Sequence, residues 1–323
     1  MKKRIAIIDL WRLIACLMIM GRHLVNHGIY GEPFFETWIY VEFFLILSGG
    51  LSFRCFVKDN NCSFENLCKN AVYCTFRKFI KLTPYVFLSA SLFYLLNIQQ
   101  GKRSISSMLE LPRITFLLTS GSMGANWFLV ALFMAYPCFY LLCHMKSQYF
   151  IYLVSFFVSV VYYESRDILN DRSIPYSIVR VFSGLLLGVI SYGFSQILNE
   201  RSFSPFYKVL LTVVEQGCLI FTVVCAYFNF DIWRFDLLCF VVAVSIILSE
   251  QSYTCHLNSS LISYGGKISM VMYLFHNCVG MCLSCLFETI PHSYFITMYY
   301  LCTFVISSIV HICVNPLVKK VKL

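Results

Sequence analysis

Long apolar runs separated by short polar segments constrain the fold of this chain more than any other feature. Each run is close to the roughly 20 residues that an α-helix needs to cross the hydrocarbon core of a bilayer. Inside lipid the backbone must satisfy its own hydrogen bonds, and a helix does so. The sequence therefore predicts an all-α, polytopic integral membrane protein with about ten transmembrane helices. The predicted spans cover residues 5–25, 35–56, 83–98, 125–144, 148–164, 177–197, 207–228, 233–249, 268–287 and 294–315.

The composition agrees with this interpretation. Hydrophobic residues make up 59% of the 323 residues and charged residues only 13%, whereas a soluble domain has about 25% charged residues. The first apolar run is too long for a cleavable signal peptide and lacks a small-residue cleavage site at its end. Because no polar stretch is long enough for a separate soluble domain, we expect residues 1–323 to form a single membrane-embedded domain.

The positions of the basic residues predict the orientation in the membrane. With both termini inside, the inner segments contain fifteen Lys and Arg residues and the outer loops six. This asymmetry favours cytoplasmic termini and a multi-pass protein of the plasma membrane. It also explains the net charge of +9 without a nucleic-acid partner. Two longer loops are predicted, at 57–82 inside and at 99–124 outside.

Cysteine and histidine spacing gives little support for a metal site. The sixteen cysteines are scattered, and the CxxC of Cys282 and Cys285 lies within an apolar run. Zinc sites usually need further ligands at defined spacing. His23 and His27 are one turn apart, but the sequence offers no evident third ligand. We therefore expect these cysteines to pack in the bundle and no metal to be bound.

The first predicted helix carries charges that a membrane span normally avoids. Its stretch DLWRLIACLMIMGRH contains Asp9, Arg12, Arg22 and His23, and an ionisable group within a bilayer is costly and commonly functional. Arg12 and His23 are eleven residues apart, so they lie on one helical face, about 16 Å apart along the axis. Asp9 is placed to pair with Arg12. A polar patch without catalytic function is the structural alternative.

Five segments carry a resemblance to a known family. The pattern IDLWRLIACLMIMGRH resembles the first helix of the integral-membrane acyltransferase 3 family, in which ten residues separate an arginine from a histidine. VEFFLILSGGL, RKFIKLTPY, NWFLVALF and SMVMYLFH are similar to four further family motifs, in the same order. They span residues 41–51, 77–85, 126–133 and 269–276. The likeness extends from residue 5 to about residue 280.

Two positions depart from the family pattern. Gly50 follows Ser48 and Gly49 where family members usually have phenylalanine, and Lys78 and Lys81 replace a basic pair that is commonly arginine. Lysine binds phosphate as a point charge and lacks the bidentate fork of arginine. Gly184 and Gly188, four residues apart, additionally predict close packing of their helix against a neighbour.

The resemblance implies transfer of an acyl group, usually acetyl from acetyl-CoA, to a hydroxyl of a carbohydrate. Acetyl-CoA is then a co-substrate, and no permanently bound cofactor is expected. Arg12, oriented by Asp9, would position the donor, and His23 would act as a general base or as a transient acyl carrier. Burial would keep its imidazole neutral and basic. Arg77, Lys78 and Lys81 would contact the CoA phosphates, unless they only anchor the helix at the membrane surface.

A second set of residues is expected to bind the carbohydrate. The set consists of Glu42, Ser48, Trp127, Tyr273 and His276. Each has a structural alternative: an interfacial carboxylate for Glu42, close helix contact for Ser48, an aromatic belt for Trp127, and a buried polar pair for Tyr273 with His276. Arg12, Arg22, Arg54 and Arg180 are the basic residues inside or at the edge of predicted helices.

Two other classes of function also bury charged groups in membranes. A transporter or flippase of a lipid-linked saccharide is the main alternative, although such proteins often have inverted repeats and broken helices. The sequence shows no evident repeat, and its prolines lie mostly near the ends of spans, Pro137 being the exception. A non-catalytic membrane scaffold is the third interpretation, and it gives no use for Arg12 and His23 on one face.

Overall fold

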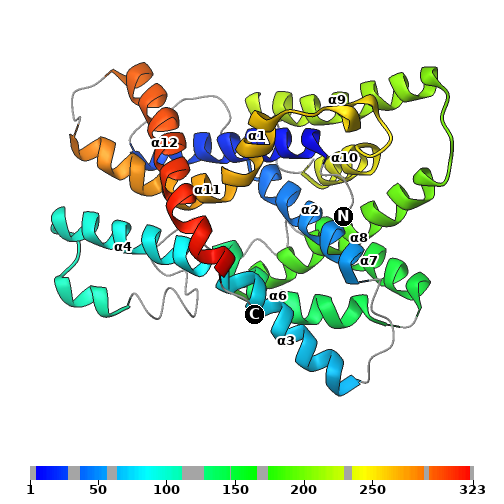
Figure 1. Ribbon diagram of the computed structural model, residues 1–323, viewed down its shortest axis with the longest axis horizontal. Coiled ribbons are helices and arrows are strands. Elements are labelled where there is room, and N and C mark those ends of the chain that lie inside the picture. The colour runs from blue at the N-terminus through cyan, green and yellow to red at the C-terminus, as the bar shows by residue number, and fades with distance from the viewer. Residues whose placement is uncertain are drawn as a thin grey trace.

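The computed structural model describes residues 5–27, 37–56, 64–110, 127–145, 147–165, 174–228, 235–286 and 291–320. In these segments the regular structure is helical, and they contain no β-strand. The prediction of an all-α fold is therefore confirmed for the part of the chain that is described. Figure 1 shows the helices gathered around a common interior.

Every predicted span contains a helix. In chain order the elements are α1 (Ala6–Arg22), the 3-10 helix η1 (His23–His27), α2 (Ile39–Phe56), α3 (Phe64–Ile80), α4 (Thr83–Gln99), η2 (Ile105–Glu110), α6 (Trp127–Cys143), α7 (Gln148–Glu164), α8 (Ile174–Asn199), α9 (Pro205–Tyr227), α10 (Phe235–Leu248), η5 (Tyr253–His256), α11 (Ser260–Leu286) and α12 (His292–Lys320).

Helix length separates these elements into two groups. Among the described residues, five helices are long and apolar enough to cross a membrane, namely α2, α8, α9, α11 and α12. The number rises to six if α3 and α4, which meet at a bend of 48°, form one span. Several of the other helices have 17 residues or fewer. The chain is thus a helical membrane protein, and ten spans with cytoplasmic termini remain a prediction.

The segment 57–82, predicted as a loop on the cytoplasmic side, contains a helix for most of its length, because α3 occupies Phe64–Ile80. A search for long apolar runs misses this helix since polar residues interrupt it. Lys69 and Glu65 form an ion pair of 2.7 Å one turn apart on its exposed face. For the same reason α11 begins at Ser260, eight residues before its predicted start.

Helices α1 and α11 pack side by side in parallel (Figure 1). The Cys16 thiol donates a hydrogen bond to the Ser269 carbonyl, 253 residues further along the chain, at 3.1 Å. His27 packs directly against Gly280, with the same separation in sequence. This constant offset shows that the two helices run in the same direction and stay in register for several turns.

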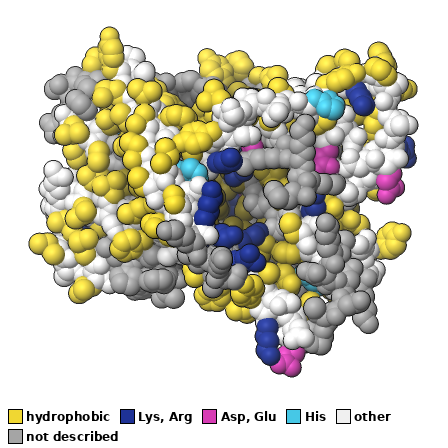
Figure 2. Space-filling view, in the orientation of Figure 1, with side chains coloured by type: hydrophobic (Ala, Val, Ile, Leu, Met, Phe, Trp, Pro, Cys, Tyr) yellow, Lys and Arg dark blue, Asp and Glu magenta, His cyan; other side chains and the backbone are white. Residues whose placement is uncertain are grey.

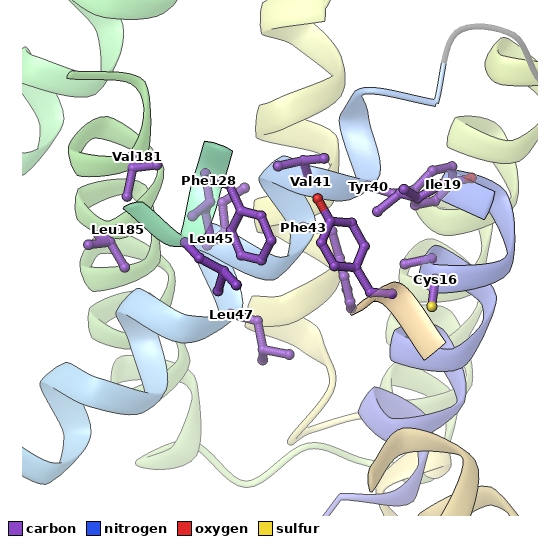
Figure 3. Packing of buried hydrophobic residues seen from close by; sticks show 14 of the residues in the cluster. Cys16, Ile19, Tyr40, Val41, Phe43, Leu45, Leu47, Phe128, Val181 and Leu185 are labelled. Atoms are coloured by element: carbon purple, nitrogen blue, oxygen red, sulfur yellow. The ribbon is translucent and has the colours of Figure 1, made fainter. Parts of the chain in front are cut away.

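Helices α2 and α8 form a second parallel pair through glycines. A Cβ atom at Gly49 would overlap the Leu185 backbone, and one at Gly188 would overlap the Ile46 carbonyl. Only glycine permits this backbone approach, so the predicted close packing around Gly184 and Gly188 is confirmed. Figure 3 shows buried side chains of α1, α2, α6 and α8 that pack together in the same core.

The outer surface of several helices is apolar. Helices α9 and α12 leave large hydrophobic side chains exposed, among them Val213, Ile220, Leu301 and Ile312. Figure 2 shows hydrophobic side chains spread over much of one face of the molecule. A surface of this kind suits lipid contact, whereas soluble proteins rarely expose large apolar patches.

Candidate active site

Two histidines from distant parts of the sequence face each other at one end of the α1–α11 pair. His23 begins η1, directly after α1, and His276 lies on α11. The centres of their rings are 4.9 Å apart and the ring planes are tilted by 50°. His276 is fully buried, whereas His23 is only partly buried. The parallel register of the two helices therefore brings together two predicted site residues.

The hydrogen bond of His276 fixes where its proton lies. Nδ1 of His276 is 2.5 Å from the Tyr273 carbonyl oxygen, and a carbonyl can only accept. Nδ1 therefore carries the proton, and Nε2 presents a lone pair. Within the described part of the chain, this buried Nε2 has no hydrogen-bond partner. An unsatisfied buried acceptor is costly, which makes this nitrogen a candidate for contact with a substrate.

Asn26 lies beside the other histidine. Its Nδ2 is 3.0 Å from Nδ1 of His23. In this orientation the amide donates to a lone pair on Nδ1, and the His23 proton then lies on Nε2. If the amide rotates by half a turn, its oxygen accepts from an Nδ1–H and the lone pair moves to Nε2. Asn26 is thus placed to select the tautomer of His23.

His27 occupies an aromatic pocket on the other side of η1. Its ring centre is 5.9 Å from that of Tyr299 and 6.3 Å from that of Phe295, both on α12. Among the described residues, no three His, Cys, Asp or Glu side chains are grouped so that they could hold a metal ion. The aromatic contacts of His27 therefore indicate that this residue packs beside the His23–His276 pair.

Asp9 and Arg12 form the predicted ion pair near the other end of α1. Arg12 Nη1 is 3.5 Å from Asp9 Oδ1, and the Asp9 side chain is only 3% exposed. Asp9 packs against Gly266 of α11, where a larger residue would collide with it. The pair offsets part of the cost of burying a carboxylate and keeps the guanidinium on the helix face that leads to His23.

Basic side chains lie at the ends of other helices. Lys78 donates a hydrogen bond to the Ser52 hydroxyl at 2.7 Å, and its ammonium lies 4.0 Å from the centre of the Tyr136 ring. Arg77 and Lys81, near the α3–α4 bend, are exposed. Lys78 is thus held by α2 and α6, while its two predicted partners remain open to a ligand.

Figure 2 shows Lys and Arg side chains gathered around a hollow near the middle of the face in view. Lys267 of α11 and Lys319 of α12 lie near His311 of α12. His311 in turn lies 3.4 Å from the Tyr85 hydroxyl. Sequence reasoning assigned no site role to Lys267 or Lys319, because each is an ordinary basic residue at a helix end.

Glu42 has partners that the sequence did not predict. Arg180 of α8 forms an ion pair with Glu42 Oε1 at 2.6 Å, and the Tyr163 hydroxyl donates to Oε2 at 2.9 Å. Both carboxylate oxygens are therefore occupied from α7 and α8. The sequence contained part of this information, because an arginine inside an apolar helix, such as Arg180, needs a carboxylate partner.

The remaining predicted residues lie on α2, α6 and α11. Ser48 is half-buried, next to the glycines that contact α8. Tyr273 is buried, with its ring 5.6 Å from His276 and 5.0 Å from Phe128. Trp127 begins α6, and its side chain lies outside the described structure. The structure thus unites His23, Tyr273 and His276. Glu42 is bonded to Arg180, whose guanidinium lies over the Trp38 ring that Arg22 also contacts.

A bundle of apolar helices that buries ionisable side chains is typical of a membrane protein, and the buried groups mark the interior of the bundle as the candidate site. The family model described as an acyltransferase domain matches residues 5–314, nearly the whole chain. The chain therefore belongs to the acyltransferase 3 family and is an enzyme that transfers acyl groups. No curated protein and no solved structure gives a significant match.

Proposed function

We propose that this enzyme transfers an acetyl group from acetyl-CoA to a hydroxyl of a cell-surface or lipid-linked carbohydrate, at the plasma membrane. Membership of the family supports membrane acyl transfer to carbohydrates. The observation that carries the mechanism is the pair of facing imidazoles, with ring centres 4.9 Å apart. One ring has its proton fixed on the backbone side, and the other is partly open to a substrate.

The reaction replaces a thioester with an ester. The acceptor hydroxyl attacks the carbonyl carbon, a C–O bond forms, and the C–S bond to CoA breaks. His23 takes the proton of the attacking hydroxyl as general base and then delivers it to the departing sulfur. In the alternative mechanism, a His23 ring nitrogen attacks the thioester and CoA leaves, and the acyl group then passes from His23 to the acceptor hydroxyl. His276 presents a lone pair beside the proton that His23 acquires.

The donor is proposed to enter from the cytoplasm. The phosphates would be held by Arg77, Lys78 and Lys81, and Arg12 would position the arm that carries the thioester. Asp9 keeps Arg12 in place through their ion pair. Acetyl-CoA is a co-substrate in this scheme, and no cofactor is bound permanently.

The acceptor is proposed to approach the histidine pair with contributions from Ser48, Trp127, Tyr273 and His276. Tyr273 and His276 have the strongest support, because His276 faces His23 and Tyr273 lies beside the His276 ring. Glu42 would act through Arg180 and Tyr163, since its own oxygens are bonded to them.

The test is mass spectrometry of surface glycans in a host strain that lacks the gene. We expect loss of an acetyl increment, restored by the wild-type protein and not by His23→Ala expressed at the same level. His256→Ala is the control, because His256 is exposed and lies in η5, outside the helices that carry the site residues. Glycans of unchanged mass but lower abundance at the surface would instead support a transporter.

A further inference from the structure

An apolar cavity lies between α1, α2, α6 and α11. Its walls come from Ile19, Val41, Phe44, Phe128 and Met270, together with Tyr273 and Ser269. Figure 3 shows Ile19, Val41 and Phe128 arranged around this part of the core. Because four helices contribute to its walls, the packing of the bundle defines the shape of the cavity.

The cavity lies next to the histidine pair. Ile19 precedes His23 by one helical turn, and Tyr273 precedes His276 by about one turn. The Tyr273 ring, which forms part of the wall, is 5.6 Å from the His276 ring. A small group bound in the cavity would therefore lie about one turn from the imidazoles, on the side of the bundle that leads toward Arg12.

The chemistry of the walls favours a hydrocarbon group. The Ser269 hydroxyl donates to the Gly266 carbonyl at 3.0 Å, so its proton is used within α11. The volume is about 20 Å³, and a single water-sized group needs roughly 10–15 Å³. Apolar cavities of this kind are usually dry and bind apolar groups. This volume has room for one methyl group.

We infer that this cavity receives the methyl end of the donor's acyl group, and that its walls restrict the enzyme to acetyl donors. The inference rests on the proposed function and extends it to the choice of acyl group. In the transfer step the acetyl carbon exchanges its bond to sulfur for a bond to the acceptor oxygen, while its methyl group stays in the cavity. A propionyl or butyryl group would have to displace packed side chains.

The experiment compares acetyl-CoA, propionyl-CoA and butyryl-CoA as donors for membrane vesicles that contain the full-length protein. Transfer to the vesicle glycans and release of CoA are both measured by mass spectrometry. Wild type should prefer acetyl-CoA to butyryl-CoA by at least about tenfold, since each methylene in a tight pocket changes rates by about 10- to 200-fold. Met270→Ala should lower this preference by about tenfold. Val41→Ala is a second variant in case Met270→Ala folds poorly.

Met298→Ala on α12 is the matched control, because Met298 is also half-buried but does not line the cavity. It should leave the donor preference unchanged. Equal use of all three donors by wild type would overturn the inference while leaving acyl transfer intact, and so would an unchanged preference in both cavity variants. If neither wild type nor His23→Ala releases CoA from any donor, the proposed function fails and the inference fails with it.

Discussion

His276 has an environment that makes a clear prediction possible at the scale of one residue. Its Nδ1 is committed to a backbone carbonyl, so replacement by alanine removes the free lone pair on Nε2 together with a buried ring that packs against His23 and Tyr273. We expect His276→Ala to reduce kcat by about 10- to 100-fold, and His23→Ala by about 100- to 10,000-fold, the usual range for loss of a general base.

The double variant should be no slower than His23→Ala alone, because residues that act as a unit are not additive. Single-turnover measurements of acetyl transfer would check this. Two independent, multiplicative losses would contradict the proposed cooperation of the two rings.

Asn26 offers a test that leaves the fold unaffected, because its side chain is exposed. Asn26→Leu cannot hydrogen-bond to Nδ1 of His23, and we expect its rate of transfer to fall about tenfold, by analogy with the loss of outer partners that orient a functional histidine. Asn26→Asp can only accept, so it holds the His23 proton on Nδ1 and leaves Nε2 free to act as the base, and this variant should retain most of the rate. Equal activity of Asn26→Leu and wild type would show that the tautomer is set by another group.

Loss of the Glu42–Arg180 pair is predicted to act mainly on the stability of the protein and only secondarily on catalysis. Glu42→Gln leaves a buried guanidinium without its counter-charge, which costs about 3–5 kcal/mol in soluble proteins. The double variant Glu42→Gln with Arg180→Gln should recover part of this loss. Thermal unfolding in detergent would measure both. A stable Glu42→Gln protein with reduced transfer would instead point to direct contact with the acceptor.

At the scale of the helix, two glycines can be compared: one that lies in a close helix contact and one that does not. Gly49 lies against the Leu185 backbone, whereas a Cβ at Gly217 of α9 would meet nothing within 4 Å. We expect Gly49→Ala to destabilise the protein by about 1–3 kcal/mol through overpacking and Gly217→Ala to leave the Tm unchanged or raised. If both variants melted at the same temperature as wild type, the α2–α8 contact would not be close in the membrane.

Local sequence patterns predicted the elements better than the contacts between them. The helical period placed Arg12 and His23 on one face, and the spacing of Asp9 and Arg12 predicted their ion pair. The meeting of His23 with His276 depends on the register of helices 253 residues apart, which no local pattern encodes. Helix α3 was missed because its polar residues obscure a hydrophobic run, although it packs against α6.

At the scale of the whole molecule, the parallel helix pairs agree with the predicted topology. In the ten-span scheme α1 and α11 are the first and ninth spans, while α2 and α8 are the second and sixth. Members of each pair then cross the membrane in the same direction, as their parallel packing requires.

Reporter fusions can test this arrangement. We expect green fluorescent protein fused after Leu323 to fluoresce, since it folds in the cytoplasm, and alkaline phosphatase inserted after Gly101 to be active outside. Gly101 lies in a turn with positive φ, where an insertion disturbs no helix. An inactive phosphatase at this position would contradict the predicted orientation.

Arg12 lies within helix α1, and His23 follows directly after its last residue. The helical rise therefore sets the distance between these residues along the axis at about 16 Å. For a donor held at Arg12, α1 therefore acts as a ruler. The guanidinium marks one end, and the imidazole marks where the reactive carbon must arrive. A carrier with a shorter arm would fall short of the second mark however well its charged end was bound.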